Sequence, residues 1–257
     1  MAYATGGSIN RIGGHGGQGI KEESSTQRNP LGEKLELGDG RSYRYALASA
    51  AIEIAHVVAP GPAGQLAELD STTTVSCTAG DKEFSITGSG SQLSTTAGFY
   101  NDAYLIISDG TGAGETHHIK SHTTAASDKI TFTTYDPVTT AFVAASGIAI
   151  IENNYRVLTC DGTSRAIGTD SHAVGATTRA IQSGYYFWMQ TRGICSVQLD
   201  GGNTANPTNG QPMVASASHD GLMEAKLDAN DEMQIIGHYV GTSTEDNDYS
   251  AIFLTLE

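Results

Sequence analysis

Positive charge is scarce in this chain. Its 257 residues include 14 Lys and Arg but 28 Asp and Glu, which gives a formal net charge of −14. Proteins that bind nucleic acid use clustered Lys and Arg to neutralise phosphates, so this balance argues against a nucleic-acid partner. Strong acidity also favours solubility at high local copy number.

Long apolar runs are missing as well. No stretch reaches the roughly 18 apolar residues that a transmembrane helix requires. The first residues, Met-Ala-Tyr-Ala-Thr-Gly-Gly, lack the charged and apolar regions of a signal peptide. We therefore expect no membrane partner and a cytoplasmic site of synthesis and assembly.

Cysteine is rare, with only Cys77, Cys160 and Cys195, and no Cys-x-x-Cys pair is present. An odd number without metal-ligand spacing favours three reduced, mostly buried thiols, with one disulfide plus a spare thiol as the alternative.

Dense groups of catalytic residue types are also absent. The chain has no Gly-x-Ser-x-Gly nucleophile motif. The Gly-rich stretch 109–114 is followed by Glu115 and a predicted strand, whereas a phosphate-binding loop needs a Lys and a Ser or Thr that open a helix. The pattern predicts a protein that is not an enzyme and needs no cofactor. The sequence leaves open a pair of catalytic carboxylates that the fold brings together, as in glycoside hydrolases.

Three histidines, His117, His118 and His122, are the best candidates for metal ligands. A strand would place His118 and His122 on one face, roughly 13 Å apart, and His117 on the other. That separation is too large for one ion within a chain. We predict no metal site and interpret the three as exposed residues at a sheet edge.

Turn-forming residues between short apolar runs are abundant. The 31 glycines, with Asp and Asn, separate strand-like segments from residue 35 to the C-terminus. This spacing predicts an all-β chain with short-stranded sandwich or barrel-like domains. Residues 35–37 and 41–45, around the turn Gly38-Asp39-Gly40, predict a β-hairpin.

The most aromatic stretch is Gly184 to Gly193, Gly-Tyr-Tyr-Phe-Trp-Met-Gln-Thr-Arg-Gly, which contains the only Trp. It predicts a buried strand from Tyr185 to Thr191 that is closed by Gly193, with a separate strand at 194–199. Trp188 has apolar neighbours, so Tyr186 and Trp188 are predicted to lie in the core or at a subunit interface. The alternative is a sugar-stacking platform formed by Trp188 or by the Tyr185–Tyr186 pair.

The N-terminal part differs from the rest. Residues 1–44 hold six basic and five acidic residues, net +1, while the remaining residues hold eight and 23, net −15. Apolar residues are too sparse in 1–34 to build a core alone, so this segment is predicted to be a disordered tail or an extended arm that orders on a neighbouring subunit. A main β domain is predicted over 35–64 and 159–257, with a β-rich insertion or second β domain at 65–158.

Several ordered blocks carry a resemblance. They are Leu35–Ala46, Gly98–Gly110 with Gly114–His122, Tyr135–Val138 with Asn154 and Tyr155, Gly184–Gly193 with Asp200 and Gly201, Ile236–His238, and Tyr249–Leu256. In this order, over about residues 35–257, the chain resembles the capsid decoration (cement) proteins of tailed bacteriophages.

The resemblance implies a structural virion protein on the outer capsid surface, often a homo-trimer at three-fold positions. Such a protein binds the major capsid protein and reinforces the shell against internal DNA pressure, without catalytic residues. The arm is then predicted to contact the capsid or a neighbouring subunit, with Arg11, Lys21, Arg28 and Lys34 as charge partners. A tail or head-fibre component, a carbohydrate-binding β module and a cell-wall hydrolase are the alternatives.

Overall fold

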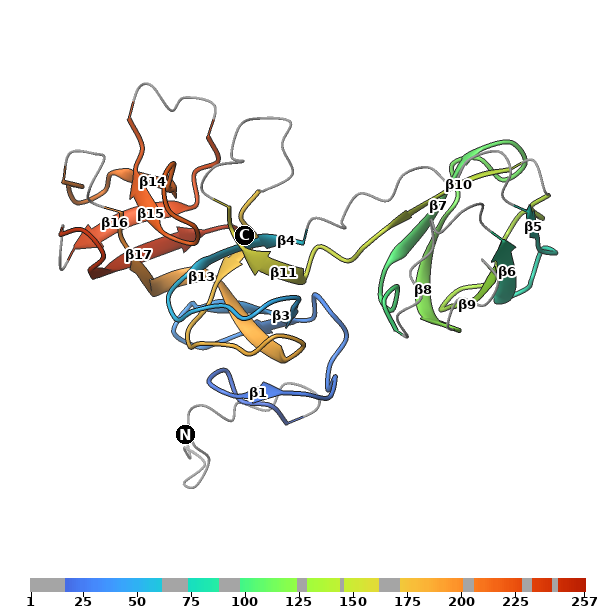
Figure 1. Ribbon diagram of the computed structural model, residues 1–257, viewed down its shortest axis with the longest axis horizontal. Coiled ribbons are helices and arrows are strands. Elements are labelled where there is room, and N and C mark those ends of the chain that lie inside the picture. Colours follow the sequence, from blue (N-terminus) through green and yellow to red (C-terminus); the bar gives the residue numbers. More distant parts are fainter. Residues whose placement is uncertain are drawn as a thin grey trace. The chain divides into compact units, whose positions relative to one another are not determined.

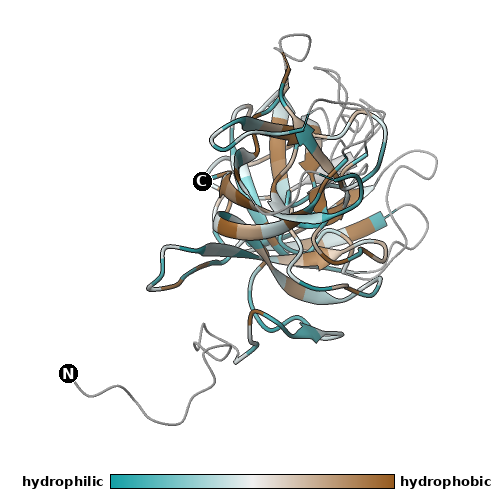
Figure 2. Ribbon diagram, turned by 90° about the vertical axis from the view of Figure 1, so that its left-hand side faces the viewer, coloured by the Kyte–Doolittle hydropathy of each residue, from teal (hydrophilic) through white to brown (hydrophobic). Residues whose placement is uncertain are grey.

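The computed structural model describes residues 17–61, 74–87, 98–123, 129–143, 146–161, 172–200, 206–227, 233–241 and 245–257. These residues form seventeen strands and no helix, so the all-β prediction is confirmed. Accordingly, no helix within these ranges is long and apolar enough to cross a membrane. Brown, the colour of hydrophobic residues, lies mainly on the strands in Figure 2.

The chain forms two compact units, one of residues 1–62 and 154–257 and the other of residues 63–153. The prediction of a β-rich insertion or second β domain at residues 65–158 stays a prediction.

The first unit contains an eleven-stranded sheet. Its strands are β1 (Glu23–Ser24), β2 (Lys34–Glu36), β3 (Ser42–Ala48), β4 (Val57–Pro60), β11 (Arg156–Thr159), β12 (Gly175–Ala176), β13 (Tyr186–Gln198), β14 (Pro212–Ala215), β15 (Met223–Ala225), β16 (Gly237–Gly241) and β17 (Tyr249–Thr255). The predicted hairpin at 35–45 is confirmed, because Leu35 on β2 lies opposite Tyr43 on β3.

Five of these strands close into a ring in the order β13, β12, β4, β11, β3, and β3 pairs back with β13. All pairs in the ring are antiparallel except β11 with β3. Figure 1 shows β3 and β13 side by side within this small barrel. Closure leaves no free sheet edge inside the ring, which makes it a rigid support.

Alternation along β3 explains how the barrel is filled. Ala46 and Ala48 point to one buried cluster, while Tyr43, Tyr45 and Leu47 point to another. Ala46 and Ala48 leave room for Phe187 and Met189 of β13, which belong to the same cluster, and the large side chains of β3 need a cover on the opposite face.

Residues from the N-terminal segment supply that cover. Ile20, Leu31 and Leu35 pack in one cluster with Trp188. The Trp188 indole Nε1 donates to the carbonyl oxygen of Gln18 at 3.1 Å, and β1 pairs with β13. Residues 1–16 of the predicted arm lie outside the described residues, and its described part, 17–34, packs on the barrel of its own chain rather than extending away.

The sequence predicted that Gly193 ends the aromatic strand, and this prediction is wrong. β13 continues for 13 residues, with Gly193 at a φ of +85° just after a register shift between Gln190 and Arg192. Before this bulge β13 pairs with β3, and from Arg192 onward it pairs with β17. A bulge with a left-handed glycine bends a strand without ending it.

Beyond the bulge, β13 joins β17, β16, β14 and β15. A second core lies here, with Cys195, Val197, Met213, Ile252 and Leu254 among its fully or almost fully buried members. All three cysteines are free and buried. Burial raises the pKa of Cys195 to about 12.

The second unit is one antiparallel sheet in the order β10, β7, β8, β9, β6, β5. Its strands are β5 (Thr74–Ser76), β6 (Glu83–Thr87), β7 (Tyr104–Asp109), β8 (Thr116–His122), β9 (Lys129–Thr134) and β10 (Gly147–Ile151). Alternating residues of these strands, such as Leu105, Ile107, Ile130 and Phe132, build its core.

Candidate functional site

The candidate site is built on the bulge in β13. Where a strand changes partner, backbone carbonyls lose their ladder bonds and need other donors. The side-chain Nε2 of Gln190 donates to the carbonyl oxygens of Arg192, at 3.0 Å, and Ile194, at 2.9 Å. Its Oε1 accepts from the Tyr43 hydroxyl at 3.3 Å. Buried side chains therefore hold the bent backbone in place.

Arg41, at the end of the β2–β3 turn, extends this network outward. Its Nη1 donates to the Tyr43 hydroxyl at 3.0 Å, and its Nε donates to the Asp39 carboxylate at 2.7 Å. The Arg41 hydrogen bond lowers the pKa of Asp39, and burial raises the pKa of Tyr43 to about 12. Asp39 is thus charged and Tyr43 neutral at physiological pH, which keeps Arg41 fixed.

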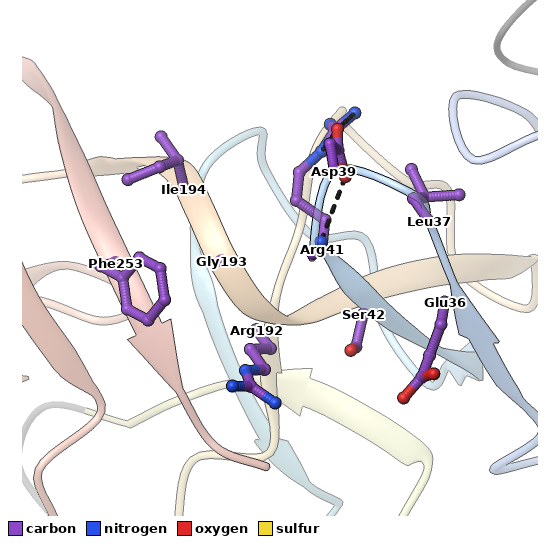
Figure 3. Close-up of a pocket in the computed structure, with 10 residues that line it drawn as sticks. Glu36, Leu37, Asp39, Arg41, Ser42, Arg192, Gly193, Ile194 and Phe253 are labelled. Atoms are coloured by element: carbon purple, nitrogen blue, oxygen red, sulfur yellow. Dashed lines mark hydrogen bonds and ion pairs between the residues drawn. The ribbon is translucent and has the colours of Figure 1, made fainter.

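A groove of about 670 Å³ opens beside the network. In Figure 3, the turn with Leu37, Asp39 and Arg41 forms one wall, and Ile194 on β13 and Phe253 on β17 form the other. Ile194 and Phe253 are directly opposite each other across the two strands.

A second pocket, of about 390 Å³, is also lined by Arg41 and Ile194. Its other lining residues include Lys21, Ile54 and Tyr249. Because the two pockets share two side chains, they are neighbours, and we call this pair of pockets the fork groove.

The fork groove exposes large apolar side chains. The exposed fractions are 49% for Ile194, 51% for Tyr249, 45% for Ile54 and 39% for Phe253. Clustered exposed apolar residues with a polar rim mark interaction surfaces, whereas scattered single ones do not.

Three cations line the same groove: Lys21, Arg41 and Arg192. Lys21 donates from Nζ to the carbonyl oxygen of Thr178 at 2.9 Å, and burial lowers its pKa. Arg192 is exposed and forms no ion pair with a carboxylate among the described residues. Arg41 is paired with Asp39. Glu36 also lines the larger pocket, and its pKa is lowered by a hydrogen bond from Lys34 and, to a smaller extent, by the charge of Arg192.

The three sequence-predicted contact residues that the structure describes have different surroundings, and Arg11 lies outside the described residues. Lys21 lines the fork groove, Arg28 is exposed on the described part of the N-terminal segment, and Lys34 forms ion pairs with two carboxylates at 2.7 and 3.1 Å. Of these three, Lys21 is the one that lines the fork groove.

The two predicted aromatic residues, Tyr186 and Trp188, pack in the same cluster. Trp188 is 1% exposed and belongs to the core of one chain, so it offers no platform for a sugar. Tyr186 is half-buried and stacks on Tyr45 with ring centroids 5.9 Å apart.

Sequence reasoning missed Arg41, Arg192, Ile194 and Phe253. Two of them carried a local signal, because Arg41 and Arg192 each adjoin a glycine at the end of a predicted strand. Their proximity depends on the change of partner along β13, which no local pattern encodes.

The three histidines of β8 are not edge residues, because β8 lies between β7 and β9. His117 is buried with its Nε2 3.0 Å from the Glu115 carboxylate. His118 lies between two tyrosine rings at 4.9 and 4.7 Å, and His122 accepts from the backbone N–H of Tyr100 at 3.0 Å. In the described ranges, no group of three or more His, Cys, Asp or Glu residues is arranged to hold a metal ion.

Ser216, Asp200 and His219 form a cluster of residue types found in catalytic triads. The order of their hydrogen bonds differs from that of a triad. His219 Nδ1 lies 3.1 Å from the Asp200 carboxylate. The Ser216 hydroxyl donates to the same carboxylate and accepts from the backbone N–H groups of Ser218 and His219, both at 3.0 Å. A catalytic triad needs the histidine between the serine and the aspartate. Here the aspartate is central and the three side chains hold a turn.

No protein-family model, no curated protein and no solved structure matches this chain. The fork groove is therefore the feature on which a functional proposal rests.

Proposed function

We propose that this chain is a non-enzymatic structural protein of a tailed-bacteriophage particle, which binds the outer surface of the capsid and stabilises the shell. The ordered blocks that resemble decoration proteins support this, as does the all-β architecture. The observation that carries the proposal is the fork groove, an exposed apolar and cationic surface on a protein of net charge −14.

The mechanism would be reinforcement by docking. The walls of the groove stand on a closed barrel and on the buried contacts of Gln190, so little conformational entropy is lost when a partner binds. Ile194 and Phe253 would exclude water at the contact, while the net negative charge of the chain would oppose association between separate trimers in solution. The proposed partner is the major capsid protein, and the proposed arrangement is a homo-trimer on the virion exterior.

The test uses phage heads that lack this protein because its gene is deleted. Purified protein is added at increasing concentration, and the bound fraction is measured by sedimentation and quantitative mass spectrometry. We expect saturation at one copy, or a simple fraction such as one third, per major capsid protein. Saturation at a handful of copies would favour a tail or fibre position, and no binding would refute the proposal.

A further inference from the structure

The charge in the fork groove is only partly balanced within the chain. Arg41 is paired with Asp39, but Lys21 donates only to a backbone carbonyl. Arg192 is exposed and forms no ion pair in the described part of the chain, and Glu36, a carboxylate that lines the same pocket, is paired with Lys34. The groove therefore presents two cations that a ligand can neutralise.

These two cations occupy different parts of the groove. Arg192 lines only the larger pocket and Lys21 only the smaller one, while Arg41 and Ile194 line both. An apolar side chain that is 49% exposed thus lies between two available positive charges.

A ligand that reaches both pockets, of about 670 and 390 Å³, must pass the two side chains that the pockets share. An extended chain can fill two such neighbouring pockets. In an extended segment, successive side chains point in opposite directions, so every second residue meets the same surface.

We propose that the fork groove binds an extended segment of another protein in which carboxylates alternate with large apolar side chains. One carboxylate pairs with Arg192 and another with Lys21, and the apolar part of the segment packs on Ile194, Phe253 and Tyr249. The carboxylates of the segment match the charge of Lys21 and Arg192, and we assign the segment to a different protein. This inference deepens the proposed function, since the segment would belong to the capsid.

The experiment has a direct arm and a particle arm. In the direct arm, a fluorescein-labelled peptide, Asp-Leu-Asp-Leu-Asp-Leu, is titrated with the full chain and followed by fluorescence polarisation. The peptide Asn-Leu-Asn-Leu-Asn-Leu is the matched neutral probe. In the particle arm, the same protein variants are added to phage heads that lack this protein.

The variants separate the effect of the groove side chains on binding from the effect of net charge. Arg192→Glu changes one exposed, unpaired side chain, and Arg192→Glu with Lys21→Glu changes both cations. Lys120→Glu with Lys129→Glu, two exposed residues of the second unit, is the control for the same change in net charge. Arg192→Glu alone keeps the test informative if the double variant does not fold.

We expect the acidic peptide to bind more tightly than the neutral one, and to weaken about tenfold for each reversed cation, because each reversal replaces an attraction to a carboxylate by a repulsion. Lys120→Glu with Lys129→Glu should bind like the wild type. Equal binding of the acidic peptide by Arg192→Glu and the wild type would overturn the inference, whatever the result of the binding measurement with phage heads. So would a groove-dependent dimer of this chain in analytical ultracentrifugation, because the occupant would then be a second copy. If the wild type fails to bind heads but binds the acidic peptide through the groove, the proposed function is refuted and the groove chemistry stands.

Discussion

Gln190 stabilises the bulge in its own strand, because its side-chain Nε2 donates to the carbonyl oxygen of Ile194, four residues further on, at 2.9 Å. The same nitrogen donates to the carbonyl oxygen of Arg192 at 3.0 Å. This contact couples the fold to the candidate site, because it sets the direction in which Ile194 enters the fork groove.

Replacing Gln190 by Leu should destabilise the protein by about 1–3 kcal/mol, because two backbone carbonyls would lose a donor and the hydroxyl of the buried Tyr43 would lose its acceptor. The measurement is the midpoint of urea unfolding. Ser196→Ala, an exposed substitution on the same strand, is the control and should change the free energy of unfolding by less than about 0.5 kcal/mol. Equal effects of the two substitutions would show that Gln190 does not support the bulge.

Gly193→Ala should also be destabilising. The residue has a φ of +85°, and a Cβ there would lie 2.9 Å from Cγ and 3.2 Å from Cα of Arg41. Strain in this region costs of the order of 1–3 kcal/mol. The control is Gly38→Ala, since Gly38 has no left-handed φ and open space around its Cβ position. Thermal unfolding that ranks both variants alike would contradict the structure at this turn.

Trp188 should emit as a buried indole. With 1% of its surface exposed, its fluorescence should resist quenching by iodide in the folded protein and become quenchable in denaturant. Easy quenching in the native state would place Trp188 at the surface and restore the sugar-platform alternative.

Trp188→Phe should loosen the N-terminal segment, because the indole donates to the carbonyl of Gln18. Limited trypsin digestion followed by mass spectrometry measures this as faster cleavage after Lys21 and Arg28. Cleavage after Lys120 is the internal control and should keep its rate. Unchanged cleavage after Lys21 and Arg28 would mean that this hydrogen bond does not hold the segment.

His219 should make stability depend on pH. Its hydrogen bond and charge interaction with Asp200 raise the pKa of His219 above the ordinary value of 6.5. The folded state therefore binds the proton more tightly than the unfolded chain. The resulting stabilisation is fully present below about pH 6.5 and is lost as the pH rises through the raised value.

The measurement compares the wild type with His219→Gln by thermal unfolding between pH 5.5 and 8.5. The difference in Tm should be largest at the acidic end and shrink toward pH 8.5. A difference that grows with pH would have the wrong sign for this interaction.

The sequence alone determined the all-β class and the β2–β3 hairpin. Both rest on local physics: alternation of period two, short apolar runs, and the turn Gly38-Asp39-Gly40. It also determined the acidity of the chain, and the apolar neighbours of Trp188 pointed to a buried or interface side chain.

Only the tertiary structure decided where the N-terminal segment lies and where β13 changes partner. Residues 17–34 have too few apolar side chains to form a core alone, yet Ile20 and Leu31 complete a cluster supplied by β3 and Trp188. A glycine after an apolar run is typical of a strand end, and the sequence therefore predicted one at Gly193. In the structure the left-handed φ of Gly193 bends the strand instead, because β17 pairs with the residues that follow. The fork groove likewise depends on Lys21, Arg41, Arg192 and Phe253, which lie far apart in the sequence and meet only when non-local strand pairing brings them together.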